Sequence, residues 1–334
     1  EPYKDLSSGK FLTNAFIRTI CKINGNFWLG THEGVVIYNI KDSSYKRIFT
    51  KTSNPASFTD NNIQDIYQDY DGDIWIASWG SGLRLWNPID SSFTDFIQDT
   101  SQYKVPVANI ILEIGQTDYP EEKDLLWLAS DNPSFSCFNK KTKKFTPFFS
   151  QSFLNNYTVL GNTTHLFFDQ RDGLWIGSQQ GLFKYDINKQ LLKLRQFYHC
   201  LNHKNLLQIT GMFLDPADQT GNTFYFGTWN DGAYVYNFKT ELCENLKIKY
   251  QLPLIDKSYI HSITRALDKI YIATDISGLI VFNPQSKSVH SKIFLANEKI
   301  LELKFDQNKI LWIGTANGLF KMDVLTEKIE KIEI

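Results

Sequence analysis

The sequence has no apolar run long enough to cross a membrane, and neither sign of charge dominates it. Its 334 residues include 35 lysines and arginines and 36 aspartates and glutamates, for a formal net charge of −1. A spanning helix would need about 18 to 20 predominantly apolar residues, and binding to nucleic acid or an anionic membrane would need a broad positive surface. We therefore expect no spanning segment here and no nucleic-acid partner.

Cysteine and recognisable catalytic motifs are also scarce. The four cysteines lie far apart, with no CxxC pair and no histidine nearby at the spacing of metal ligands. We expect them to be small buried side chains with free thiols, and we predict no disulfide and no metal site. A nucleophile elbow, a Walker loop and a Rossmann fingerprint are absent, so no cofactor is predicted. The cysteines are Cys21, Cys137, Cys200 and Cys243.

The N-terminus lacks an initiator methionine and a basic-then-apolar signal region. We expect that the chain begins after a processing site or comes from a longer protein. A missing signal region is then no evidence for the cytoplasm.

Aromatic residues are abundant, at 15% of the chain, and they follow a repeat. Seven segments share a short apolar strand with a central Trp or Tyr, then a small residue, then Ser or Thr. The aromatic residues recur about every 47 positions, which is in the range of four-stranded propeller blades. They are Trp28, Trp75, Trp127, Trp175, Tyr225, Tyr271 and Trp312.

Each copy predicts four strands, which we call a to d. An apolar strand precedes the aromatic one, often through an Asp-Gly or Asn-Gly turn suited to a hairpin. A Gly-containing turn and two more strands follow, except that the third copy has Asn132-Pro133-Ser134 in place of the Gly. The aromatic side chain should be buried between sheets, and the small residue should leave room for the next blade.

These patterns predict an all-β chain, a single seven-bladed β-propeller of four-stranded antiparallel blades over 1–334. Two segments compete for the last outer strand, Tyr3 to Leu6 and Lys328 to Ile334. Either the first closes the last blade, or the piece comes from a longer array, so 1–15 is assigned to the outer strand and linker of a closing or preceding blade. The expected blades are approximately 16–49, 63–97, 110–148, 163–197, 209–248, 260–294 and 300–334.

Two stretches carry a family resemblance. The segment from Ser57 to Leu83, with its Asp-Tyr-Asp-Gly-Asp-Ile-Trp-Ile-Ala-Ser core, resembles the two-component regulator propeller repeat, and so does Asp169 to Leu182. Copies three and five depart most from the pattern. The resemblance implies the periplasmic sensor part of an inner-membrane hybrid two-component histidine kinase, without enzymatic activity in this segment.

The resemblance also implies a ligand and protein partners. It suggests a glycan-derived oligosaccharide as ligand and transcriptional control of glycan-use genes as output. The implied protein partners are an adjoining propeller or β-sandwich domain of the same protein, and a second copy in a homodimer.

Candidate ligand residues are those that a propeller places on the face carrying the b-to-c turns and the starts of strand a. Exposed indoles suit stacking on sugar rings, and polar turn residues suit hydroxyl groups, although turns are often polar only for solvation. Polar residues at the start of strand a can line the channel, where their alternative role is bonding to water. The candidates are Trp79, Trp229, His32, Glu33, Asn230, Asp231, Asp275, Arg18, Gln64, His165 and His261.

Two alternative functions remain beside ligand sensing. A propeller glycosidase or lyase would need paired carboxylates, about 5 to 9.5 Å apart in a glycosidase, and nothing in the sequence pairs Glu33, Glu113, Asp231 and Glu302. A structural or protein-docking propeller would leave the turns without a ligand. Asp69 and Asp71 are spaced as calcium ligands, but the rest of an EF-hand loop is missing, so we interpret them as turn residues.

Overall fold

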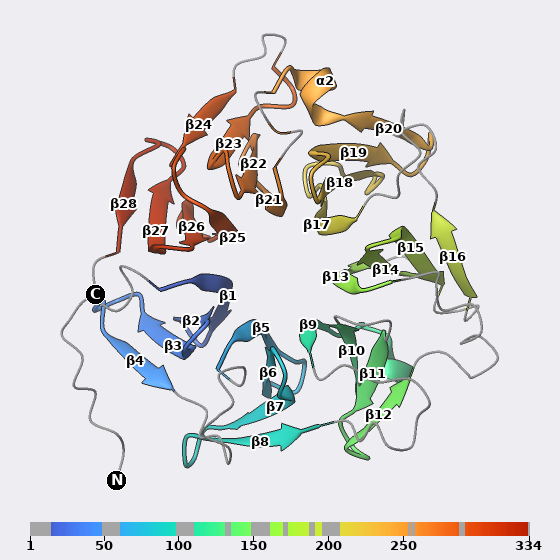
Figure 1. The fold of residues 1–334 in the computed structure, drawn as a ribbon, viewed down its shortest axis with the longest axis vertical. Helices are drawn as coiled ribbons and strands as arrows, with labels where there is room; N and C mark the ends of the chain where they lie inside the picture. Colours follow the sequence, from blue (N-terminus) through green and yellow to red (C-terminus); the bar gives the residue numbers. More distant parts are fainter. Residues whose placement is uncertain are drawn as a thin grey trace.

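Seven four-stranded antiparallel sheets surround a central channel in the computed structural model (Figure 1). Within each sheet the strands follow chain order, so each blade is a consecutive meander whose first strand lies at the channel. This confirms the predicted fold. The structure describes residues 15–48, 61–97, 110–130, 135–147, 161–169, 173–186, 191–195, 208–252, 255, 258–286 and 291–332.

The first three blades span the N-terminal part of the ring. Blade 1 contains β1 (Ile17–Ile23), β2 (Asn26–Thr31), β3 (Gly34–Asn39) and β4 (Tyr45–Ile48). Blade 2 contains β5 (Ile63–Gln68), β6 (Ile74–Ser78), β7 (Gly82–Asn87) and β8 (Ser92–Phe96). Blade 3 contains β9 (Ile111–Gly115), β10 (Leu125–Ser130), β11 (Ser136–Asn139) and β12 (Lys144–Pro147), with the short helix η3 (Pro120–Glu122) between its first two strands.

The other four blades complete the ring. Blade 4 contains β13 (Thr163–Asp169), β14 (Gly173–Ser178), β15 (Gly181–Asp186) and β16 (Leu191–Arg195). Blade 5 contains β17 (Ile209–Leu214), β18 (Thr223–Thr228), β19 (Ala233–Asn237) and β20 (Leu242–Asn245), followed by the helix α2 (Leu246–Tyr250). Blade 6 contains β21 (Ile260–Ala266), β22 (Lys269–Thr274), β23 (Leu279–Phe282) and β24 (Lys292–Phe294). Blade 7 contains β25 (Ile300–Phe305), β26 (Ile310–Thr315), β27 (Gly318–Asp323) and β28 (Ile329–Lys331).

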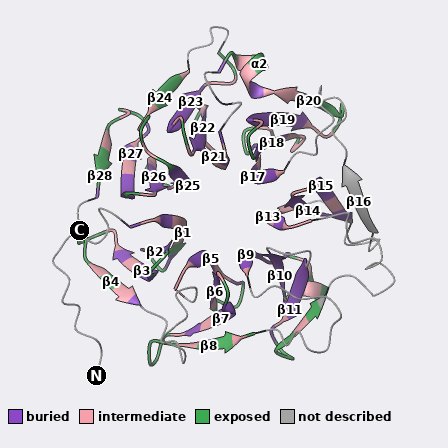
Figure 2. Cartoon of the chain, in the orientation of Figure 1, coloured by how far each residue is buried: buried purple, intermediate pink, exposed green. Residues whose placement is uncertain are grey.

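The second strand of every blade carries the core, as the repeat predicts. All seven of its central aromatic residues are at most 5% exposed, and Figure 2 shows exposed residues concentrated on outer strands such as β8 and β28. The small residue two positions later is required by close packing. A Cβ added to Gly227 would lie 2.4 Å from Ile260 Cγ2, and one added to Gly30 would lie 2.8 Å from Ile63 Cγ2, so each neighbouring blade approaches to contact distance.

The ring closes by packing between blades 7 and 1. The Phe27 and Trp312 rings lie 4.6 Å apart in a cluster with Leu319 and Ile332. The segment near the C-terminus supplies β28 as the outer strand of blade 7. The other candidate for that place, Tyr3 to Leu6, lies outside the described residues.

A buried polar turn fastens blade 2 to blade 3. Asp69, between β5 and β6, accepts hydrogen bonds from the Asp73 backbone N–H at 2.9 Å and from the Trp75 indole Nε1 at 2.9 Å. Lys140, at the end of β11, contacts the same carboxylate at 2.9 Å and also pairs with Asp71. Asp69 and Asp71 are thus engaged in turn and ion-pair contacts, as the turn interpretation expects.

One expectation about the cysteines is wrong. Cys243 on β20 is disulfide-bonded, whereas Cys21 and Cys137 are free thiols, as expected. Burial raises the pKa of each of these two thiols to about 11, which keeps them protonated and unreactive at neutral pH. Cys200 lies outside the described residues, as do the turn of the third copy and residues 1–14. No helix in the described ranges is long and apolar enough to span a membrane.

Candidate functional site

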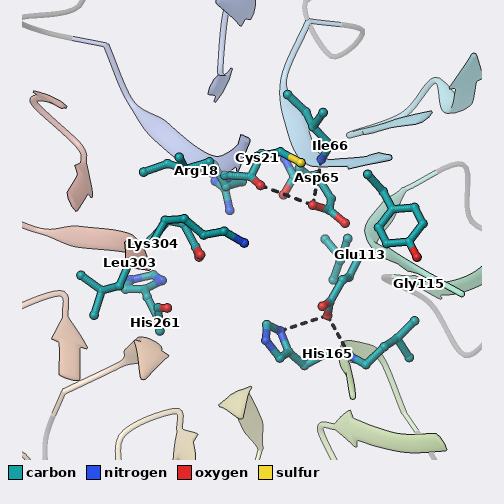
Figure 3. Close-up of a pocket in the computed structure, with 18 of the residues that line it drawn as sticks. Arg18, Cys21, Asp65, Ile66, Glu113, Gly115, His165, His261, Leu303 and Lys304 are labelled. Atoms are coloured by element: carbon teal, nitrogen blue, oxygen red, sulfur yellow. Dashed lines mark hydrogen bonds and ion pairs between the residues drawn. The ribbon is translucent and has the colours of Figure 1, made fainter. Parts of the chain in front are cut away.

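The central channel encloses about 900 Å³ and is lined by the first strands of all seven blades, namely β1, β5, β9, β13, β17, β21 and β25. Each of these strands is the inner edge of its sheet, so the N–H and C=O groups that face the channel need partners other than a strand of the same sheet. Figure 3 shows Asp65, Glu113 and His165 on one side of the channel, and Arg18, His261 and Lys304 on the other.

A β-bulge near the start of each first strand determines which side chains enter the channel. In all seven blades the pairing with the second strand skips one residue, and the strand then continues in regular register. Such a bulge leaves its extra residue unpaired and reorients the side chains beside it. The skipped residues are Arg18, Gln64, Leu112, Thr164, Thr210, His261 and Leu301.

Two carboxylates following these bulges connect neighbouring blades. Asp65 accepts the Ile114 N–H of blade 3 at 2.9 Å, and Glu113 accepts the Leu166 N–H of blade 4 at 2.7 Å. Each bond satisfies an edge-strand donor that faces the channel. Asp65 also accepts the hydroxyl of Thr19 in blade 1 at 3.3 Å. Both carboxylates therefore have a structural role that differs from that of a catalytic pair.

Burial governs protonation inside the channel. It raises the pKa of Asp65, and with the charge of Asp65 it raises the pKa of Glu113 well above its usual range. Burial lowers the pKa of His165 to about 4, so its contact with Glu113, at 3.2 Å from Nδ1 to Oε2, is made by a neutral imidazole at pH 7. The channel interior consequently carries less charge at pH 7 than the number of its ionisable side chains suggests.

Glu302 provides a test of this burial. Burial raises the pKa of its carboxyl to about 8 from 4.5, while Lys304 opposes the rise and Asp65 adds to it. A raised carboxyl pKa contributes stability that is complete below about pH 4.5 and is lost as the pH rises through about 8.

We expect Glu302→Gln to stabilise the protein above about pH 8 by on the order of 1 kcal/mol or more, relative to its effect below about pH 4.5. Chemical denaturation at both pH values measures the difference, with the exposed Glu330→Gln as control. An equal effect of Glu302→Gln at the two values would contradict the raised pKa.

An aromatic and basic cluster lies at the channel beside blades 5, 6 and 1. The rings of Tyr259 and His261 stack with their centroids 4.0 Å apart, and Trp229 meets Tyr259 edge-on at 4.6 Å. Burial lowers the pKa of His261 and raises that of Tyr259, and Arg18 lies close enough for its charge to add to the first shift and oppose the second. Trp229 is 50% exposed, so one face of this cluster remains open to a ligand.

The structure places the other predicted residues in several environments. Gln64 lines the channel with Arg18, His165 and His261, and it donates to Asn62 Oδ1 at 2.9 Å. Trp79 is half-buried and forms an isolated β-bridge with Ile110. Neither Trp79 nor Trp229 is among the described residues that line the channel.

The polar turn residues are mostly engaged with protein. Glu33 pairs with Arg47 at 3.2 Å and lies 3.6 Å from His32, which is exposed. Asp231 accepts the Tyr234 hydroxyl at 2.6 Å, beside the exposed Asn230. Their role in ligand binding stays a prediction.

Two hydrogen bonds connect Asp275 with the backbone of Tyr259. The Asp275 carboxylate accepts the Tyr259 N–H at 2.8 Å, and the Asp275 N–H donates to the Tyr259 carbonyl oxygen at 3.2 Å. The sequence did not indicate Tyr259 or Asp65 as site residues. Their positions in the repeat could have done so: Tyr259 directly precedes the first strand of blade 6, and Asp65 directly follows the bulge in the first strand of blade 2.

The cluster offers groups that are suited to non-covalent recognition. Neutral donors, a guanidinium and aromatic faces can bind hydroxyl groups and sugar rings. Within the described residues, no three His, Cys, Asp or Glu side chains gather into a group that could hold a metal ion.

Comparison with known proteins confirms the resemblance in the sequence. Residues 57–80 match the family "Two component regulator propeller". Histidine kinase P4 of Formosa agariphila is 24% identical over 305 residues, which cover 91% of this chain and 18% of that protein.

Two solved structures share the fold. The extracellular domain of hybrid two component system BT3049 from B. thetaiotaomicron is 21% identical with a TM-score of 0.71, over 93% of this chain and 40% of that one. The extracellular domain of hybrid two component system BT4673 has a TM-score of 0.73 at 16% identity, over 98% of this chain and 43% of that one. The present chain therefore spans less than half the length of each relative.

Proposed function

We propose, from the two component regulator propeller repeat that this chain carries, that it is the ligand-sensing propeller of a hybrid two-component sensor histidine kinase. In this proposal it recognises a glycan-derived oligosaccharide without chemical conversion and controls transcription of glycan-use genes. The observation that carries the recognition step is the aromatic and basic cluster of Arg18, Tyr259 and His261 at the central channel, together with the exposed Trp229 that contacts Tyr259.

Several features support a binding role over catalysis. The channel carboxylates Asp65 and Glu113 are engaged with backbone N–H groups of neighbouring blades, which restricts their movement. The exposed indole of Trp229 and the stacked Tyr259 ring offer apolar faces, which suit the C–H face of a pyranose. A site of this kind binds and releases its ligand unchanged.

The disulfide at Cys243 supports a periplasmic location, since disulfides persist mainly in oxidising compartments. Because the chain covers 40% and 43% of the two solved extracellular domains, we propose that an adjoining propeller or β-sandwich domain of the same protein packs beside it. Ligand binding would then shift how the propeller sits against that domain or against a second copy in a homodimer.

The experiment is a fluorescence titration of the propeller with neutral and acidic oligosaccharides, with product analysis as a control for turnover. We expect saturable indole quenching without turnover, and a loss of about fivefold in affinity for Trp229→Ala, because aromatic stacking contributes about 1 kcal/mol. Trp79→Ala tests whether both indoles contact the ligand.

Turnover of any saccharide would contradict the non-catalytic assignment. If no saccharide bound, the result would favour a propeller that docks to another protein. Unchanged affinity in both tryptophan variants would place the ligand away from these two indoles.

A further inference from the structure

Arg18 is a half-buried cation without a protein counter-ion in the described ranges. No protein group there accepts a hydrogen bond from its Nε, which is inaccessible to solvent, and its contact partner is the Phe16 ring, 5.2 Å from the guanidinium carbon. Placing a charge in a low-dielectric site is costly unless an opposite charge or hydrogen bonds compensate it. Such an arrangement is suited to an anion supplied from outside the protein.

Groups beside Arg18 also suit an anionic ligand. His261 Nε2 is likewise buried and without a protein partner among the described residues. Lys299 is exposed and lies close enough to lower the pKa of His261, which burial and the two cations bring to about 3. Burial also raises the pKa of the Tyr259 phenol, which keeps its hydroxyl protonated and able to donate. We call Arg18, Tyr259, His261 and Lys299 the basic lip.

The rest of the channel does not cancel this charge. Asp275 lies near Tyr259, and its carboxylate accepts the Tyr259 backbone N–H, but its single negative charge faces the two cations Arg18 and Lys299. Asp65 and Glu113 have raised pKa values and are engaged with blades 3 and 4. The basic lip therefore keeps a local excess of positive charge beside the aromatic face of Trp229.

We propose that the basic lip selects saccharides that carry an anionic substituent, a carboxylate or a sulfate, with Arg18 as the principal contact to that group. The inference rests on the proposed function and narrows its ligand class to acidic oligosaccharides. In the bound state the anion would accept hydrogen bonds from the guanidinium, while the sugar ring lies against Trp229 and Tyr259.

The test compares ligands that differ at the anionic group. Short oligogalacturonides and their fully methyl-esterified, neutral counterparts are titrated calorimetrically against the wild-type propeller, and sulfated galactan fragments form a further arm. We expect the carboxylate or sulfate form to bind about tenfold or more tightly than a neutral form, with a preference that shrinks as salt rises. Comparison of the two anionic arms distinguishes a uronate from a sulfate ligand.

Variants locate the effect. Arg18→Gln should lower the affinity for the anionic form to about that of the neutral form, and Arg18→Lys should restore the charge preference in part, because lysine keeps the charge without the bidentate fork. If Arg18→Gln fails to fold, Lys299→Gln, at an exposed position, provides a second test, and it should lower the affinity for the anionic form about two- to threefold. Lys328→Gln, on an exposed outer edge of blade 7, is the matched control and should have no effect.

Three results would overturn the inference. Equal affinity for charged and neutral forms, or an undiminished preference in Arg18→Gln, would contradict it while the proposed function stands. Binding of neutral saccharides alone would do the same. Failure of all saccharides to bind would overturn it together with the proposed function.

Discussion

Truncation of Trp75 to alanine is expected to lower the free energy of unfolding by about 3 to 5 kcal/mol. The Trp75 side chain is fully buried, and its ring contacts Phe96 at 5.9 Å and Phe138 of the next blade at 5.5 Å. Its removal creates a cavity between two sheets and also leaves the Asp69 carboxylate without the indole donor. Both effects destabilise the same blade interface.

Denaturant titration measures this loss, and Trp229→Ala is the matched control. Trp229 is 50% exposed, so the same truncation there should cost no more than about 1 kcal/mol. If both variants lost the same stability, Trp229 would be a packing residue and its proposed part in binding would fail.

Asp69→Ala is expected to cost about 3 to 5 kcal/mol as well, although the removed side chain is small. Its carboxylate is fully buried and compensates the ammonium of Lys140, which is 7% exposed. Without Asp69, Lys140 keeps the exposed Asp71 as its one partner among the described residues, and the Trp75 indole loses its acceptor. A buried ammonium that retains only an exposed, hydrated partner is more costly than the loss of the bond itself.

Two further variants separate charge from turn geometry. Lys140→Met should cost about 1 kcal/mol or less, because Asp69 keeps its backbone and indole donors. In blade 7, Asp306 repeats the bond to an indole, with Trp312 Nε1 at 3.0 Å, while Ile40 occupies the place of Lys140. Asp306→Ala should therefore cost about 1 to 3 kcal/mol, and a loss as large as that of Asp69→Ala would contradict the role of the buried lysine.

The blades could be predicted from the sequence because their signals are local. The strand-b aromatic, the small residue after it and the hairpin turn lie within a few positions, and each has one physical cause in packing or turn geometry. Gly227 illustrates this, since its contact with Ile260 of the next blade is required wherever two sheets pack that closely. Seven repeats of such a signal were enough to predict the fold.

The channel could be predicted only in part. Arg18 and His261 were found because they stand at equivalent positions of two blades, but their neighbour Tyr259 depends on how blade 6 meets blade 5. The bond from Ile114 N–H to Asp65 likewise exists only once the ring is closed. The disulfide at Cys243 depends on contacts between distant segments, which cysteine spacing alone does not reveal.

Hydrogen–deuterium exchange with and without a bound acidic oligosaccharide tests most directly whether this propeller recognises its ligand at the channel. We predict slower exchange on binding in residues 15–23 and 258–266, because Arg18 lies on β1, His261 lies on β21 and Tyr259 directly precedes β21, and all three line the channel. The outer strands β8 and β28 should be unchanged. Protection confined to outer strands at saturating ligand, or protection nowhere, would contradict it.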